Sequence, residues 1–384
     1  MRRKVILLGA SGNIGLQTID IIKQQSERFE IVGLSVGRDV DNMLVSENAF
    51  LKKQLKYICT GSRRDDLTEL YPDCQFFYGS EGLIELTSKP ADLVINALQG
   101  FVGLLPTLNA IRHKVNVALA NKETLVACGE IVMNEARSYG VDIIPIDSEH
   151  SAIRQCLLGY RHEEISNLII TASGGSFRNL KREQLEDVTL EMALNHPNWS
   201  MGKKITIDSA TMMNKGFEVI EAHWLFDVDY DHIKTVLHPE SIVHSMVEFR
   251  DHAILRQMGV SDMRMPIQFA LNYPERNINT SDSLDLIKVG ALHFGELSLE
   301  RYPLLGLAYR TGKRGGILPA VMNGANERAV KLFLNREISF LDIERLIFAT
   351  VEKAENISNP TVDDIIESDR WAQEYVQHLT EGKE

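Results

Sequence analysis

The sequence predicts an α/β fold, in which a Rossmann-like doubly wound N-terminal domain precedes a mixed α/β domain, a linker and a C-terminal helical domain. Three observations support this prediction. The first 147 residues alternate short, β-branched apolar runs with amphipathic segments, which is typical of a parallel sheet covered on both faces. A glycine-rich turn follows the first run. Beyond Asp147, strand and helical patterns are mixed, and from Leu304 onward only helical patterns remain.

The N-terminal domain, residues 1–147, contains six predicted strands separated by helical patterns. They lie at 4–8, 30–36, 57–60, 92–96, 116–120 and 142–146. Because each is apolar along nearly its whole length, we expect both faces of the sheet to be buried.

The second domain, residues 148–272, mixes strands and helices. Its predicted strands lie at 168–171, 235–237, 241–250 and 253–258, and the last two have the spacing of adjacent antiparallel strands.

Residues 273–299 are rich in Pro, Asn, Ser, Thr and Asp and predict a linker. The region 300–384 predicts a helical domain, with helices at 320–335, 340–356 and 361–381.

The composition is that of a globular protein with an acidic surface. The chain has 384 residues, of which 44% are hydrophobic and 24% charged, and 41 Lys and Arg oppose 53 Asp and Glu for a net charge of −12. This balance argues against nucleic acid as the main partner, although local basic pockets for phosphates remain compatible with it.

The apolar runs are too short to span a bilayer, and the N-terminus lacks a secretory signal pattern. Four cysteines, at 59, 74, 128 and 156, have neither metal-site spacing nor the density of a disulfide framework. We therefore expect a cytoplasmic protein with no membrane partner.

The turn Gly9-Ala10-Ser11-Gly12-Asn13-Ile14-Gly15 lies between the first strand and an amphipathic helix. In this context, glycines bring backbone N–H groups and the positive helix N-terminus against a pyrophosphate. The motif alone is weak evidence for nucleotide binding, because a tight turn without a ligand can have the same glycines. The strand before it and the helix after it favour a nucleotide.

The second strand ends at Gly37-Arg38-Asp39, where an NAD-specific domain usually has a carboxylate for the ribose. A guanidinium at Arg38 can pair with a 2′-phosphate, so the sequence favours NADP. Asp39 weakens this inference, and a solvated loop arginine is the alternative.

Acidic residues follow the sixth predicted strand, in Asp147-Ser148-Glu149. If the backbone stays extended there, both carboxylates project to one side and can meet a divalent cation. The alternative, that Asp147 or Ser148 merely caps a helix, is equally compatible with these three residues.

A third carboxylate lies in the segment 208–218. On a helix, Asn214 and Lys215 both neighbour Glu218, so this face offers an amide, an ammonium and a carboxylate. An ordinary surface Lys–Glu pair is the alternative.

Two loops also carry residues suited to ligand binding or catalysis. Ser173-Gly174-Gly175-Ser176 can curl its N–H groups around an anion, or be a plain turn. The loop His196-Pro197-Asn198-Trp199-Ser200-Met201-Gly202 carries an imidazole, an indole and a thioether, and we expect it to act as a lid. His223, His238 and His244 sit singly in apolar contexts and are assigned no catalytic role.

Together, GASGNIG, ANKE (120–123), DSEHSA (147–152), SGG, HPNWSMG and DSATMMNKG resemble, over the whole chain, the 1-deoxy-D-xylulose 5-phosphate reductoisomerase family. The resemblance implies a homodimeric enzyme that rearranges and reduces 1-deoxy-D-xylulose 5-phosphate to 2-C-methyl-D-erythritol 4-phosphate. It implies NADPH and a divalent cation, Mn or Mg, as cofactors, a place in non-mevalonate isoprenoid precursor synthesis, and a catalytic and dimerisation role for residues 148–272.

The resemblance also assigns residues to sites. The metal ligands implied are Asp147, Glu149 and Glu218. Catalytic roles are implied for Lys122, Ser148, Glu149, His196 and Glu218, and Trp199 is implied to cover the substrate. Phosphate contacts fall on Ser173, Ser209, Asn214 and Lys215. NADPH contacts fall on Ser11, Gly12, Asn13, Ile14, Gly37, Arg38, Asp39, Asn121, Glu123 and Gly202. The chain departs from the family at its glycine turn, often GSTGSIG, and at Ser176, where Pro is common.

Two other functions remain open at this level. An NADP-dependent semialdehyde dehydrogenase also begins with such a glycine turn but needs an activated nucleophilic cysteine, and Cys128 and Cys156 lie in helical patterns without an obvious base. A non-catalytic NADP-sensing protein would have no use for the acidic triad or the indole-bearing loop.

Overall fold

The computed structural model describes the chain except residues 1, 38–39, 41–42, 45–47, 279–280 and 383–384. The chain divides into two compact units, each described here by itself. The first comprises Met1–Thr124, Glu130–Ser151 and Asp262–Ser281, and the second comprises Leu125–Gly129, Ala152–Ser261 and Asp282–Glu384.

The first unit is built on a parallel sheet, which among the described residues has seven strands in the order β4-β3-β2-β1-β5-β6-β7. The strands are β1 Arg3–Leu8, β2 Phe29–Val36, β3 Tyr57–Thr60, β4 Gln75–Tyr78, β5 Leu93–Asn96, β6 Asn116–Leu119 and β7 Ile143–Pro145. All six predicted strands are confirmed to within one residue at each end, and β4 was not predicted.

The order of the strands reverses at β1, which pairs with both β2 and β5. Because crossovers between parallel strands are right-handed, this reversal places helices on both faces of the sheet. Among these strands, the helices wholly within this unit are α1 Asn13–Gln24, α3 Asn48–Leu51, α4 Asp65–Leu70, α5 Gly79–Thr87 and α6 Leu104–Arg112. Helices α7 Lys122–Tyr139 and α8 Ser148–Cys156 contain residues of both units. The predicted doubly wound fold is confirmed.

Helix α12, Arg264–Asn272, also belongs to the first unit, although it follows the strands of the second domain in sequence. The Arg3 guanidinium donates to the Leu271 carbonyl at 2.7 Å, and the buried amides of Gln25 and Gln268 join at 2.9 Å. The compact units therefore differ from the predicted segments 148–272 and 273–299.

The second unit contains a mixed sheet, five-stranded among the described residues, in the order β11-β10-β8-β9-β12. Its strands are β8 Ile165–Ala172, β9 Ile233–Leu237, β10 Val243–Phe249, β11 Ile254–Met258 and β12 Gly295–Glu296. The predicted antiparallel pair, β10 and β11, is confirmed.

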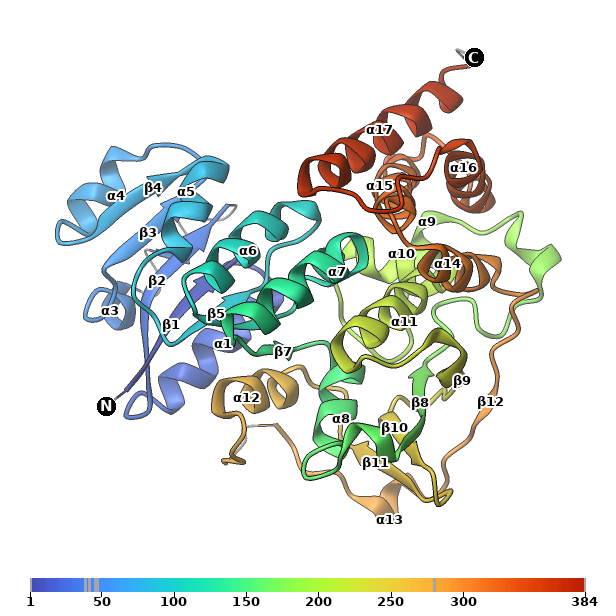
Figure 1. The fold of residues 1–384 in the computed structure, drawn as a ribbon, viewed down its shortest axis with the longest axis horizontal. Coiled ribbons are helices and arrows are strands. Elements are labelled where there is room, and N and C mark those ends of the chain that lie inside the picture. Colours follow the sequence, from blue (N-terminus) through green and yellow to red (C-terminus); the bar gives the residue numbers. More distant parts are fainter. Residues whose placement is uncertain (1, 38–39, 41–42, 45–47, 279–280, 383–384) are drawn as a thin grey trace. The chain divides into compact units, whose positions relative to one another are not determined.

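The helices of the second unit are α9 Leu190–Leu194, α10 Lys203–Thr211, α11 Met213–Phe226, α13 Leu286–Val289, α14 Pro303–Arg314, α15 Leu318–Leu334, α16 Phe340–Lys353 and α17 Val362–Thr380. Helices α14 to α17 form a cluster, orange to red in Figure 1, as predicted for the C-terminal region. This cluster shares one hydrophobic core with the mixed sheet, where Phe177 meets Phe340 edge to face with ring centroids 5.0 Å apart. Among the described residues, no helix combines the length and apolarity needed to cross a membrane.

Candidate functional site

The glycine turn in the first unit has the geometry of a phosphate-binding turn. Gly9 has φ +80°, and its N–H donates to the Ser35 hydroxyl at 2.9 Å, which ties the turn to β2. A side chain on Gly15 would lie 2.4 Å from the Gly9 carbonyl oxygen, so the turn rests directly on the first turn of α1. Gly12 precedes α1 without a side-chain cap on the helix N–H groups. These donors fit a pyrophosphate.

We expect Gly15→Ala to lift the turn from α1, because the new methyl group would overlap the backbone of Gly9 and Ala10. The free energy of unfolding should fall by about 1–3 kcal/mol, and NADPH affinity should fall with it. Gly306→Ala, in α14, is the matched control, since its methyl group would find nothing nearer than 3.5 Å. Chemical denaturation and NADPH fluorescence titration measure both quantities, and equal results for the two variants would contradict this account.

Asn121 and Glu123 flank the start of α7, directly after β6. The buried Asn121 amide donates to the carbonyls of Leu98 and Gly100 at 3.0 and 2.8 Å and to the Glu123 carboxylate at 3.1 Å. These bonds fix both side chains at the carboxyl edge of the sheet, where open α/β sheets bind ligands.

Asp147 lies at the same edge, after β7. Its carboxylate is 2.7 Å from the Lys122 ammonium, and both side chains are 10% exposed. Burial alone would raise the pKa of Asp147, but the positive charge of Lys122, with His150 3.8 Å away, holds that pKa well below its usual range. The carboxylate is therefore ionised and is a hard oxygen ligand.

Of the two readings left open for Asp147-Ser148-Glu149, an extended backbone and a helix cap, the structure has the cap, because α8 begins at Ser148. Asp147 caps this helix by accepting the Glu149 N–H at 3.3 Å, and the Ser148 hydroxyl donates to the Glu149 carboxylate. Asp147 therefore caps the helix and forms the ion pair at the same time: one oxygen accepts the Glu149 N–H, and the other lies against the Lys122 ammonium.

In the second unit, helices α10 and α11 meet at Met212, which adopts a left-handed conformation with φ +62°. Asn214 donates to one oxygen of Glu218 at 2.5 Å, and the Lys215 ammonium pairs with the other. The predicted neighbours are confirmed, but the alternative of a surface pair is wrong, because Lys215 and Glu218 are 4% and 1% exposed. A buried ion pair of this kind is costly to break.

The loop after β8 approaches α10 through its glycines. Gly174 and Gly175 have φ +87° and +68°, and a side chain on Gly175 would lie 2.5 Å from the Ser209 carbonyl oxygen. Ser173 and Ser209 are thereby held in neighbouring segments, as expected for two residues predicted to contact one phosphate.

The loop after α9 places His196 against Ser173. His196 Nδ1 accepts the N–H groups of Asn198 and Trp199 at 3.2 and 3.0 Å, so in the neutral ring the hydrogen lies on Nε2. Nε2 then donates to the Ser173 hydroxyl oxygen at 3.0 Å. The Gly175 N–H also points at this oxygen, at 3.3 Å. The Ser173 hydrogen is therefore left to donate to a ligand.

Burial, with a smaller effect of the Arg178 charge, lowers the pKa of His196 to about 4. Between this value and the ordinary one near 6.5, the unfolded chain binds more protons, so the free energy of unfolding should fall as pH drops through that window. We expect the NMR signals of His196, assigned with His196→Gln, to titrate near pH 4. A midpoint near 6.5 would contradict the buried neutral ring.

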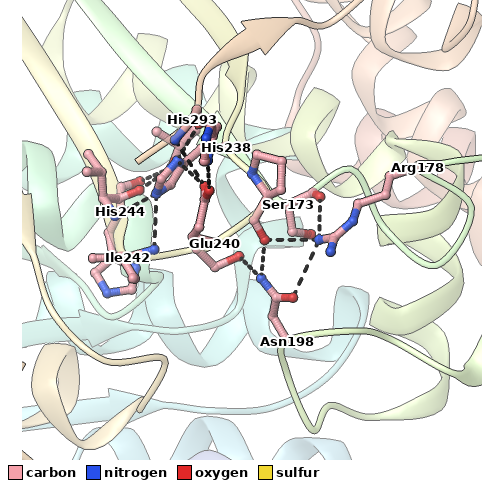
Figure 2. Close-up of polar contacts among 12 residues, drawn as sticks. Ser173, Arg178, Asn198, His238, Glu240, Ile242, His244 and His293 are labelled. Carbon is pink, nitrogen blue, oxygen red and sulfur yellow. Dashed lines mark hydrogen bonds and ion pairs between the residues drawn. The ribbon is translucent and has the colours of Figure 1, made fainter. Parts of the chain in front are cut away.

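Two residues near Ser173 were not predicted, Arg178 and the side chain of Asn198. Figure 2 shows both beside Ser173, with Arg178 bonded to the Ser173 carbonyl oxygen. Asn198 lies in the loop singled out from the sequence, so its position was expected but its role was not. Arg178, five residues beyond Ser173, belongs to no motif recognised in the sequence.

The predicted site residues fall into two groups. The first unit holds Ser11, Gly12, Asn13, Ile14, Gly37, Asn121, Lys122, Glu123, Asp147, Ser148 and Glu149. The second unit holds Ser173, His196, Trp199, Gly202, Ser209, Asn214, Lys215 and Glu218. Arg38 and Asp39 lie outside the described residues.

The cysteines do not favour the dehydrogenase alternative. All four are thiols rather than disulfides, and Cys128 and Cys156 are 2% and 8% exposed. A nucleophile must reach its substrate, so these buried thiols are poor candidates.

A doubly wound sheet with this glycine turn, together with buried carboxylates beside lysine side chains, defines a dinucleotide-binding enzyme of the α/β class. The family model of 1-deoxy-D-xylulose 5-phosphate reductoisomerase matches residues 5–129, and two models of its C-terminal domain match residues 143–226 and 258–375. The chain belongs to the 1-deoxy-D-xylulose 5-phosphate reductoisomerase family.

Relatives of the same family match over their whole length. The reductoisomerase of Exiguobacterium sibiricum is 52% identical over 381 residues, which cover 98% of this chain and 99% of the relative. The solved reductoisomerase of Zymomonas mobilis in complex with NADPH is 38% identical, with a TM-score of 0.92 over 99% of this chain and 100% of that one. A DOX-P reductoisomerase in complex with NADPH, fosmidomycin and magnesium is 36% identical, with a TM-score of 0.91 over 99% of this chain and 98% of that one.

Proposed function

We propose that this protein converts 1-deoxy-D-xylulose 5-phosphate to 2-C-methyl-D-erythritol 4-phosphate with NADPH and a divalent cation, in isoprenoid precursor synthesis. The observation that carries the proposal is the match to reductoisomerases along the chain, with 52% identity over 98% of its residues. The glycine turn, the buried ion pairs and the Ser173 loop supply the groups that this chemistry needs.

NADPH is the proposed nucleotide. Two solved relatives contain it, and the start of α1 after the turn at Gly9 to Gly15 has no side-chain cap, so its N–H groups suit a pyrophosphate. The proposed contacts are Ser11, Gly12, Asn13, Ile14, Gly37, Arg38, Asp39, Asn121, Glu123 and Gly202. Arg38 is proposed to select the 2′-phosphate.

The proposed ligands of the cation are Asp147, Glu149 and Glu218. All three offer carboxylate oxygens, which suit Mg²⁺ and Mn²⁺. Magnesium is supported by its presence in a solved relative, and manganese is proposed as an alternative on the same ligand chemistry.

When bound, the cation supplies polarisation of substrate oxygens and NADPH supplies hydride. Lys122, Ser148, Glu149 and His196 are proposed to orient the carbon chain, with Lys122 also keeping Asp147 ionised. Ser173, Ser209, Asn214 and Lys215 are proposed to bind the phosphate, and Trp199 is proposed to cover the substrate and exclude water.

We also propose a cytoplasmic homodimer. Its cysteines are thiols, as is usual in a reducing compartment. The edge strand β11 exposes the apolar side chains of Ile254 and Leu255, at 49% and 37%. An apolar sheet edge is a ready surface for pairing with a second copy.

The proposal is tested by following NADPH absorbance with 1-deoxy-D-xylulose 5-phosphate, with and without a chelator. We expect oxidation of NADPH that stops when the cation is removed and returns when Mg²⁺ or Mn²⁺ is added. Turnover that is insensitive to the chelator, or no turnover at all, would overturn the proposed function.

A further inference from the structure

Arg178 joins three segments of the second unit through one nitrogen of its guanidinium. Nη1 lies 3.3 Å from the Ser173 carbonyl oxygen, 2.9 Å from that of Pro239 and 3.5 Å from the Asn198 side-chain oxygen. These acceptors belong to the loop after β8, the turn between β9 and β10 and the loop after α9 (Figure 2).

Asn198 completes the connection from the other side. Its amide nitrogen donates to the Pro239 carbonyl at 2.5 Å and to the Ser241 hydroxyl at 2.7 Å. The loop that carries His196 and Trp199 is thus attached to the same turn as Arg178.

The turn itself is a firm support. The His238 ring is fully buried, and its Nε2 accepts the N–H groups of Ile242 and Val243 at 3.2 and 3.1 Å. Glu240, on the same turn, accepts from His293 Nδ1 at 2.5 Å, as Figure 2 shows. The carbonyl of Pro239 is therefore fixed relative to the strands on either side.

The contacts of Arg178 are all with uncharged oxygens. In the part of the chain that the structure describes, no carboxylate lies within ion-pair distance of its guanidinium. The guanidinium therefore holds the backbone of Ser173 in place, and the Ser173 hydroxyl has a hydrogen left to donate to an anion.

We propose that Arg178 is a positioning residue for the phosphate of the substrate, which acts by holding Ser173 and Asn198 on the turn at Pro239. This inference rests on the proposed function, in which Ser173 contacts that phosphate. Arg178 acts through Ser173 and does not itself touch the phosphate. A lysine should replace it poorly, because an ammonium is more strongly hydrated than a guanidinium and costs more to hold half-buried against uncharged carbonyls.

The test compares steady-state constants of wild type, Arg178→Met, Ser173→Ala and the double variant. We expect Arg178→Met to raise KM for 1-deoxy-D-xylulose 5-phosphate about tenfold while KM for NADPH and kcat change little. Because Arg178 acts through Ser173, the double variant should be no worse than Ser173→Ala alone. Arg178→Lys should resemble Arg178→Met, and Arg161→Met, at an exposed arginine, should match wild type.

Three results would overturn the inference: an unchanged KM, effects that multiply in the double variant, or full rescue by lysine. If Arg178→Met does not fold, as judged by circular dichroism, Asn198→Ala takes its place in the same cycle, since Asn198 joins the same turn. A wild-type enzyme without turnover would refute the proposed function instead, so the two failures are distinguishable.

Discussion

Replacing Glu218 by glutamine should lower metal-dependent kcat about 1,000-fold, because a carboxylate ligand worth several kcal/mol at the cation is lost. Glutamine keeps the size of the side chain but only one of the two oxygens that Asn214 and Lys215 use, so some stability should be lost. Circular dichroism checks that the variant remains folded. NADPH binding should survive, since the glycine turn belongs to the other unit. Kinetics across a range of Mn²⁺ concentrations and NADPH fluorescence measure the two effects.

Glu248→Gln is the matched control for Glu218→Gln. Glu248 also has an asparagine and a lysine as partners, with Asn167 at 2.8 Å and Lys234 at 3.4 Å, but it lies on β10 and is not a predicted ligand. We expect it to keep wild-type turnover. Near-normal activity of Glu218→Gln at saturating Mn²⁺ would remove Glu218 from the cation site.

Lys122→Met should lower the free energy of unfolding by about 3–5 kcal/mol, because it leaves the buried Asp147 carboxylate without its ammonium partner. A divalent cation can neutralise the same carboxylate, so Mg²⁺ should raise Tm more in this variant than in wild type. Calorimetry with and without MgCl₂ checks both expectations.

Arg63→Met serves as the control for Lys122→Met, because the pair of Arg63 with Asp65 is exposed on the same unit. Its stability should match wild type, as is usual for a surface ion pair. If Lys122→Met were as stable as this control, the ion pair at Asp147 would contribute nothing measurable to the free energy of unfolding.

The sequence predicted the fold best where buried apolar residues follow a regular pattern along the chain. Strands β1, β2 and β5 are buried on both faces, so their apolar runs stand out against amphipathic helices. Strand β4 was missed because it is an edge strand of four residues, two of them exposed. The place of α12 was missed because it depends on contacts with residues more than 240 positions away, such as Gln25 with Gln268.

The same distinction holds for the site. The neighbours Asn214, Lys215 and Glu218 were predictable because helical spacing alone brings them together. The pairing of Lys122 with Asp147 depends on two adjacent strands ending at one edge of the sheet, and the contact of Arg178 with Pro239 joins segments 61 residues apart. Such pairings come from tertiary structure, and no local pattern marks them.

The Ser173 hydroxyl oxygen already has two hydrogen-bond donors, and this determines which ionic form of the substrate phosphate binds better. A hydroxyl oxygen accepts two hydrogen bonds, and His196 and Gly175 supply both, so Ser173 can offer a ligand only a donor. A phosphate monoester takes up a proton near pH 6 and then carries its own P–OH donor. Ser173 therefore favours the doubly ionised ester, while the neutral His196 ring persists to about pH 4. Weaker binding in mild acid should accordingly follow protonation of the substrate, with the protein itself still in its neutral-pH form at this position.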